Sequence, residues 1–384
     1  MTDTLREVVE ALAPLRRKAG SPEERQAAEW LAERLRAAGA RDVRVEDVPF
    51  RDGYARLMLP LNLLALFGGR LGALAAAALI ADDASNYKRV WRRAVTRPRT
   101  TTNVIAELGP ADAPGTLVVL AHHDAAPTGA VFDQGAQRAL ARHFPGVVAR
   151  SYTSFPLWWL VLAGPLLTAL GFKRTGRVPS LLTGLAGLDL ARDRIVPGAN
   201  DNLSGCAALV ALAEQGRLPL RVVLASCGAE EVLQGGIYDF VDRHLRPLDP
   251  ARTWVLNLDT IGSPELFMIE GEGILKMEDY CGPDFRDRVA AAAERAGVPL
   301  VRGCRARSST DSVIPSRAGY PTATLCSWEP ETRLLSNYHL MTDTPDRLDY
   351  ATVAAAVAVA SALAEDLAST SATRSDSADP TASA

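Results

Sequence analysis

Histidine and carboxylate side chains recur in five short motifs, and this combination of groups can bind metal ions. In chain order the motifs are His122-x-Asp124, Asn200-Asp201-Asn202, Ala229-Glu230-Glu231, Asn257-Leu258-Asp259 and Tyr338-His339. Zinc is bound by imidazole nitrogens and carboxylate oxygens, and a catalytic zinc site keeps one coordination position open for water. The set is large enough for two neighbouring ions. Such a pair needs a bridging carboxylate, for which Asp201 is the natural candidate, and Glu230 is then left as a general base.

Three of these motifs lie at or shortly after the ends of predicted strands, which occupy residues 116–121, 220–226 and 253–259. The side chains delivered by these strand ends are His122, the pair Glu230 and Glu231, and Asp259. Open α/β sheets bind their ligands outside the carboxyl ends of the strands, so these groups are expected at one edge of the sheet. Asp201 stands just before a predicted helix and can be aimed at the same edge by the turn that precedes it. His339 arrives from a late loop.

The hydrophobic pattern predicts an α/β protein. Two helices open the chain, and the second is indicated by Ser21 as N-cap, Pro22 in the first turn and Glu24 closing a capping box. The expected strands then cover 43–48, 103–108, 116–121, 220–226, 253–259 and 321–325, and the main helices cover 203–215, 236–244, 283–296 and 350–367. Several strands are apolar throughout, as expected where helices cover both faces of a sheet. We therefore expect a three-layer α/β/α sandwich with a mixed, mostly parallel central sheet.

The organisation along the chain favours one domain over residues 1–368, interrupted by apolar helical insertions at about 51–100 and 130–192. The tail at 369–384 is rich in Ser, Thr, Ala and Asp and lacks apolar periodicity. A segment of this composition cannot bury enough apolar surface to order itself, so we expect it to be disordered.

Bulk properties narrow the classes of partner and compartment. The formal net charge is −3 and the isoelectric point is near 6.0, so nucleic acid is not an expected partner. The five cysteines are an odd number without the paired spacing of a zinc ribbon or redox motif, and they indicate buried thiols in a reducing compartment. The first residues do not form a secretory signal, so the cytoplasm is the expected location.

Taken in order, the five motifs resemble those of the co-catalytic zinc exopeptidase family, which includes leucyl aminopeptidases, glutamate carboxypeptidase II and glutaminyl cyclases. The resemblance covers roughly residues 100–130 and 195–365. It implies a phosphorylase/hydrolase-like zinc exopeptidase architecture. It implies that His122 and Asp259 bind one metal ion and that Glu231 and His339 bind a second. Asp201 would bridge the two ions and Glu230 would be the proton shuttle. Asp124 would be the carboxylate that orients the His122 imidazole.

The activity implied by this resemblance is hydrolysis of an N-terminal peptide bond in a peptide or aminoacyl substrate. A hydroxide held between two zinc ions would attack the carbonyl, and Glu230 would move the proton to the departing amine. Cobalt or manganese could occupy the same ligands. Two alternatives stay open: a mononuclear zinc cyclotransferase or amidohydrolase, and a non-catalytic binding protein on the same fold.

Some residues depart from the family or have simpler interpretations. Ser312 stands where a histidine is common, which leaves a substrate role for the Ser309-Thr310-Asp311 stretch open, and Leu233 replaces a usual glycine, which implies a slightly different loop. Glu230 and Glu231 could also begin a solvated helix, and Asp124 could cap a turn. The three remaining histidines are expected to be structural or on the surface; these are His123, His143 and His244.

Two apolar stretches, 57–80 and 155–172, raise the question of a membrane. A single crossing at 155–172 would place His122 and Asp201 on opposite sides, which excludes it. Each arm of a hairpin at 57–80 holds only about half of the ~20 residues that a spanning helix needs. We therefore expect helical hairpins that cover the rim of the site, pack on one another or form a contact between subunits of a homo-oligomer.

Peripheral membrane contact is the alternative for these stretches. Six basic residues surround Trp91 after the first stretch: Lys88, Arg89, Arg92, Arg93, Arg97 and Arg99. Such a run can attract anionic lipid. A solvated helix face is the simpler interpretation, and it is the one we expect here.

Overall fold

The computed structural model describes residues 1–154, 157–216 and 218–376, and their strands form one sheet. The strands are β1 (Arg41–Phe50), β2 (Arg99–Leu108), β3 (Thr116–His122), β4 (Arg221–Cys227), β5 (Thr253–Leu258), β6 (Glu265–Glu272), β7 (Glu278–Asp279), β8 (Val301–Ala306) and β9 (Thr322–Trp328). Their order in the sheet is β1-β2-β4-β3-β5-β9-β6-β7, with β8 paired to β6. The four adjacent strands β4, β3, β5 and β9 are parallel, whereas β1, β2 and β6 join the sheet in antiparallel pairs.

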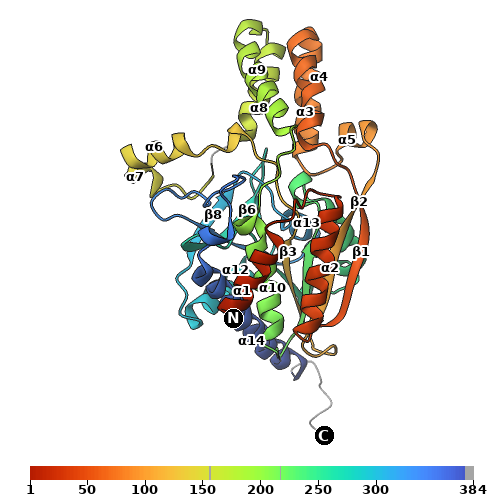
Figure 1. Ribbon diagram of the computed structural model, residues 1–384, viewed down its shortest axis with the longest axis vertical. Coiled ribbons are helices and arrows are strands. Elements are labelled where there is room, and N and C mark those ends of the chain that lie inside the picture. Colours follow the sequence, from red (N-terminus) through yellow and green to blue (C-terminus); the bar gives the residue numbers. More distant parts are fainter. Residues whose placement is uncertain (155–156, 217, 377–384) are drawn as a thin grey trace.

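Helices cover both faces of this sheet (Figure 1). Those of the main body are α1 (Thr2–Leu12), α2 (Pro22–Ala37), α10 (Ser204–Glu214), α11 (Gly235–Phe240), α12 (Pro283–Arg295), α13 (Val313–Arg317) and α14 (Tyr350–Asp376). Strand β3 shows how the layers arise: Leu117, Val119 and Ala121 belong to the core shared with α1, α2, α10, α12 and α14, whereas Val118 and Leu120 belong to the core shared with α11 and α13. Alternate residues of a strand point to opposite faces, so a fully apolar strand needs a cover on both sides. The expected three-layer α/β/α sandwich is confirmed.

The N-terminal helices begin as the sequence predicts. The Ser21 side chain accepts a hydrogen bond from the Glu24 backbone N–H at 3.1 Å. The Glu24 carboxylate turns back to accept from Gly20 N at 2.7 Å, one residue before the N-cap. Its other oxygen accepts from Thr101 Oγ1 and from Ala229 N. Glu24, which closes the capping box of α2, therefore also fixes the backbone immediately before Glu230.

Both apolar insertions fold into helical hairpins that pack on one another. The first contains α3 (Tyr54–Phe67) and α4 (Gly69–Ala84), and the second contains α8 (Leu157–Ala169) and α9 (Lys173–Leu190). Helix α4 packs on α8 and α3 packs on α9, so the two hairpins form one four-helix bundle. Figure 1 shows this bundle projecting from the top of the main body. The shorter helices α5 (Val90–Val95), α6 (Gly135–His143) and α7 (Pro145–Val148) complete the insertions.

The expectation that the basic run around Trp91 is a solvated helix face is wrong for two of its six basic residues, Arg89 and Arg92, whereas the other four are exposed. Arg92 is buried and forms a bidentate ion pair with buried Asp83 at 2.8 and 2.9 Å. Arg89 donates hydrogen bonds to Asn86 Oδ1 and to the Leu233 carbonyl. Because these partners lie both in the first hairpin and in the loop after Glu231, the two arginines fasten the base of the hairpin to the body.

Two further differences concern parts of the chain whose structure the sequence does not predict. The expected set of strands lacks β6, β7 and β8, although β6 is almost entirely buried. Helix α14 runs to Asp376, so the expectation of disorder is wrong for 369–376: extending an existing helix costs little once it has nucleated. Residues 377–384, the rest of that expected tail, lie outside the described residues. Tyr350–Ser369 is long and apolar enough to cross a membrane, but half of it is buried in the protein core.

Candidate metal centre

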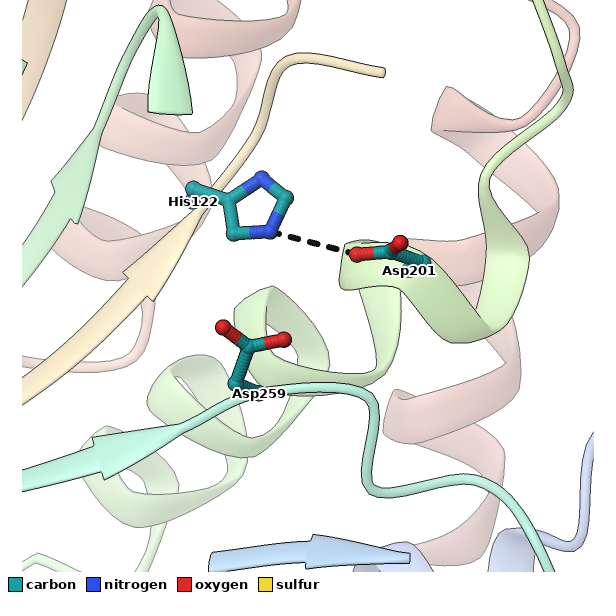
Figure 2. A group of neighbouring side chains, drawn as sticks. All are labelled: His122, Asp201 and Asp259. Carbon is teal, nitrogen blue, oxygen red and sulfur yellow. Dashed lines mark ion pairs between the residues drawn. The ribbon is translucent and has the colours of Figure 1, made fainter. Parts of the chain in front are cut away.

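Three candidate ligands converge beside the carboxyl ends of the central strands, as Figure 2 shows. His122 ends β3, Asp259 directly follows β5, and Asp201 lies in the turn Ala199–Leu203 before α10. The His122 Nε2 atom lies 3.3 Å from Asp201 Oδ1. Ligand atoms of all three residues lie within 4.8 Å of one another, close enough to bind one metal ion.

A second group lies beside the first and shares Asp201 with it. His339 Nε2 is 3.1 Å from Asp201 Oδ2 and 3.3 Å from Glu231 Oε2. These three ligand atoms also lie within 4.8 Å of one another. The two oxygens of Asp201 therefore face different histidines, which is the arrangement expected of a carboxylate between two metal ions.

Asp124 holds the residues of both groups in place. Its carboxylate accepts hydrogen bonds from Glu230 N at 3.0 Å and Glu231 N at 3.1 Å. One of its oxygens is also 3.4 Å from Nδ1 of His122, the ring nitrogen turned away from Asp201. A buried carboxylate at this place fixes the ring orientation and increases the basicity of the other nitrogen.

Asp343 fixes the backbone of Asp201, the aspartate that both groups share, and the sequence analysis missed it. Its carboxylate accepts from Asn200 N at 2.8 Å and from Asp201 N at 3.1 Å. Burial raises the pKa of Asp343 to about 7. Its place in the loop that also carries His339 is the one sequence signal that could have identified it.

Arg17 was missed as well. It is fully buried, and it donates hydrogen bonds to the carbonyls of His123 and Pro197 at 2.8 Å each. Those carbonyls belong to the segments that carry His122 and Asp201. Burial lowers the pKa of Arg17 to about 10. The N-terminal segment thus ties two of the ligand-bearing segments together.

Glu230 lines a cavity that also contains the candidate ligands. Its Oε1 accepts a hydrogen bond at 3.0 Å from Gln234 Nε2, and the side-chain oxygen of Gln234 accepts at 2.7 Å from Asn86 Nδ2. The Leu233 departure noted in the sequence belongs to this loop, in which Leu233 and Gln234 both have positive φ. The loop is therefore held partly by the base of the first hairpin.

The cavity has an apolar wall formed by Phe267, Ile269, Cys304, Ala306, Cys326 and Trp328. The second insertion contributes residues 151–154, which pair with β8: Arg305 N donates to the Tyr152 carbonyl at 2.8 Å. The insertion also supplies Phe132, whose ring packs edge-on against His339 at 4.3 Å. Among the described residues, the four bundle helices contribute nothing to the lining of this cavity.

The electrostatics of the cluster reflect an excess of buried acid. Burial raises the pKa of Glu230 well above its usual range and also raises the pKa of Glu231 and Asp259. Burial acts on Asp201 in the same direction, but His122 and His339 outweigh it and hold the pKa of Asp201 below its usual range. Burial would lower the pKa of His339, but Glu231 and Asp201 raise it to about 10.

This chemistry fits divalent cations. Imidazole nitrogens and carboxylate oxygens converge, and the carboxylates outnumber the two imidazoles in a buried space. Buried charges are strongly unfavourable unless they are paired or bind metal. Glu231 Oε1 is buried without a hydrogen-bond partner among the described residues, so it can serve as a ligand atom.

Asp311 extends the acidic surroundings. Both of its carboxylate oxygens are buried and lack a hydrogen-bond partner within the described part of the chain, and burial raises its pKa well above the usual range. Ser312, which stands where a histidine is common, shares a hydrogen bond with Thr324 Oγ1 at 2.7 Å and does not line the cavity. Outside the site, His123 pairs with Ser226, His244 with Glu46, and the five cysteines are free.

Comparisons with known proteins agree with this geometry. The model of peptidase family M28 matches residues 183–364, a range that contains Asp201, Glu230, Glu231, Asp259 and His339. No match to a curated protein was found.

The fold is similar to that of several solved structures. A glutaminyl cyclase from Bacteroides thetaiotaomicron bound to N-acetylhistamine superposes with a TM-score of 0.57 at 15% identity, over 95% of this chain and 98% of that one. A leucine aminopeptidase precursor from the same organism gives 0.56 at 15% identity, over 95% and 97%. A Zn-dependent exopeptidase from Parabacteroides distasonis gives 0.55 at 15% identity, over 95% and 98%. The resemblance inferred from the motifs is thereby confirmed: the chain matches peptidase family M28 over residues 183–364 and has the fold of exopeptidases, aminopeptidases and glutaminyl cyclases.

Proposed function

We propose that this protein is a dinuclear zinc exopeptidase that removes N-terminal residues from peptides. The observation that carries the proposal is the position of Asp201, whose two oxygens face His122 and His339 in two overlapping ligand groups. One ion would be held by His122, Asp201 and Asp259, and the other by Asp201, Glu231 and His339. When bound there, two zinc ions supply Lewis acidity for the scissile carbonyl and lower the pKa of water.

The protein's own side chains provide the proton transfer. Glu230 lies in the cavity beside both ligand groups without belonging to either, so it is placed to take a proton from water and return it to the leaving amine. Asp124 fixes the backbone of Glu230, and Gln234 fixes its carboxylate. The apolar wall with Phe267 and Trp328 suits a substrate whose first side chain is apolar.

A glutaminyl cyclase is the second candidate, supported by the similarity to cyclase structures. A mononuclear cyclase needs only one of the two groups. The presence of both groups, each with its ligand atoms within 4.8 Å of one another, favours two ions. Metal stoichiometry separates the two candidates.

The deciding experiment uses the full chain reconstituted with zinc and its Glu230→Gln variant. Elemental analysis should give two zinc ions per chain for both proteins. Hydrolysis of aminoacyl p-nitroanilides should fall by about 10²- to 10⁴-fold in the variant, the range expected for loss of a general base. A single zinc ion with cyclisation of N-terminal glutamine would support the cyclase. Two zinc ions without turnover of any aminoacyl, dipeptide or glutaminyl substrate would favour a non-catalytic binding protein.

A further inference from the structure

The four-helix bundle has an apolar interior and an apolar exterior. Its interior is a small cluster that includes Leu57, Leu61, Ile80 and Leu162. Its exterior carries Leu181, Leu182, Leu185 and Leu188 along α9, each more than half exposed. A helix that is hydrophobic all round is normally buried in a core or in lipid, yet this bundle projects from the body (Figure 1).

Four strongly exposed apolar side chains lie around the two interhelical turns, and they include the three most exposed among the large hydrophobic residues of the described chain. Phe67 is 80% exposed and Leu71 is 82% exposed, on either side of the α3–α4 turn. Leu170 and Phe172, at the α8–α9 turn, are 67% and 59% exposed. Arg70 donates a hydrogen bond to the carbonyl of Ala169, so the two turns lie side by side. Together these residues form the apolar tip of the bundle.

The acidic residues of the bundle lie only at its base, where α4 ends with Asp82 and Asp83 and α9 ends with Asp189. Residues 53–81 and 157–188 contain no aspartate or glutamate, although the chain as a whole has a net charge of −3. Four of the five cations in these ranges lie near the starts of α4 and α9, just after the two turns; they are Arg70, Lys173, Arg174 and Arg177. A cationic rim around exposed aromatic and leucine side chains is complementary to anionic lipid headgroups over hydrocarbon.

The packing inside the bundle resembles that of helices in lipid. Small residues let α8 and α9 approach closely: a Cβ atom added to Gly164 would lie 2.6 Å from the Ser180 backbone nitrogen. Thr183 donates a hydrogen bond to Asn62 across α9 and α3 at 2.8 Å. Small residues and interhelical hydrogen bonds are the features that hold helices together where lipid surrounds them.

The lengths of the helices set the depth of contact. Helix α3 has 14 residues and α9 has 18, which correspond to about 21 and 27 Å. Both are shorter than the ~30 Å hydrocarbon core of a bilayer, so the bundle can enter one leaflet but cannot cross. Lysine and arginine at the tip can extend their ends to the headgroups while their stems stay in apolar surroundings.

We propose that the tip of the four-helix bundle docks the protein on an anionic lipid bilayer, with Phe67, Leu71, Leu170 and Phe172 below the headgroups and the four tip cations at the phosphates. The docking surface is separate from the candidate metal centre, so the proposal does not depend on the catalytic assignment.

The test is sedimentation of the full chain with vesicles of phosphatidylcholine containing about 30% phosphatidylglycerol, or of phosphatidylcholine alone. We expect binding to the anionic vesicles that weakens at high salt, and much weaker binding to the neutral ones. Two variants address the two parts of the tip: Phe67→Ser with Leu71→Ser and Phe172→Ser, and Lys173→Gln with Arg174→Gln and Arg177→Gln. Each should weaken binding by about tenfold or more.

Matched controls change exposed residues outside the bundle. Phe144→Ser with Val147→Ser removes apolar surface, and Arg16→Gln with Arg142→Gln and Arg150→Gln removes charge. Both controls should bind like the unaltered protein. Absence of binding to anionic vesicles overturns the proposal. A dimer detected by sedimentation equilibrium also overturns the proposal if the apolar tip variant abolishes the dimer and neither protein binds vesicles. The tip would then be an interface between two copies of this chain.

Discussion

Gln234 holds the carboxylate of the proposed base by a hydrogen bond. Its amide nitrogen donates to Glu230 at 3.0 Å and to the Ser309 carbonyl at 2.8 Å, so one amide positions the carboxylate. Gln234→Leu keeps the volume but removes this bond. We expect kcat to fall by about tenfold, the worth of roughly one buried hydrogen bond, while KM and zinc content change little. Steady-state kinetics checks this, with Gln26→Leu on the exposed side of α2 as control. An unchanged kcat would show that Gln234 does not position the base.

Glu272 gives a pH dependence to the stability. Burial raises its pKa to about 7, although Tyr280 and Thr310 donate hydrogen bonds to its carboxylate. The folded state then holds the proton more tightly than the unfolded state, so the free energy of unfolding falls as pH rises from about 4.5 to 7. Glu272→Gln should flatten this fall, by on the order of 3 kcal/mol. Urea unfolding at about pH 4 and about pH 8, on either side of this window, measures it, with Glu10→Gln as an exposed control. Equal pH slopes for Glu272→Gln and the unaltered protein would contradict the assignment.

At the scale of elements, the base of the first hairpin depends on one buried ion pair. Arg92 binds Asp83 through two nitrogens, and both side chains are at most 1% exposed. Arg92→Met leaves the aspartate buried without a partner, which should lower the free energy of unfolding by about 3–5 kcal/mol. Adding Asp83→Leu should restore most of this loss. Chemical denaturation of the single and double variants checks it, with Arg6→Met in an exposed pair as control. A single variant as stable as the unaltered protein would refute this.

The sequence predicts well those elements whose packing requires a local pattern of apolar residues. Strands β3 and β4 are apolar throughout because they are covered on both faces, and the segments at their ends carry His122 and Glu230. Strand β6 was missed because it ends in Glu270 and Glu272, whose burial depends on partners such as Arg302 and Tyr280 that lie 32 and 8 residues away. Long-range partners of this kind leave no periodicity in the sequence.

The same reasoning explains which parts of the site could be found. The five motifs identify the candidate ligands because each residue type carries its chemistry with it. Arg17 was not identifiable, and only its place in the loop of His339 pointed to Asp343, because their targets are backbone groups of His123 and Asp201 and any chain has such groups. Asp124 could be predicted because it belongs to the His122 motif, whereas positioning residues outside the motifs become visible only when the fold is known.

At the scale of the whole molecule, metal and stability should be linked. The cluster gathers its candidate ligands from five separate segments, and ions bound there favour the folded state alone. Removing zinc with a chelator should lower the Tm, and restoring zinc at about 1,000 times its Kd should return about 4 kcal/mol. Asp201→Asn, which weakens both groups, should show a smaller response. Calorimetry measures this, and a Tm independent of zinc would contradict a metal site in the cluster.

Segments from early and late in the sequence meet at the centre of the molecule. Arg17 fixes the segments of His122 and Asp201 from the early side, and the loop of His339 and Asp343 comes just before the last described helix, α14. A chain still being synthesised therefore lacks its last candidate ligand until the whole central sheet has left the ribosome. In the proposed peptidase, both candidate metal-binding groups are therefore complete only after every strand of the sheet has been translated, and hydrolysis cannot begin before that stage.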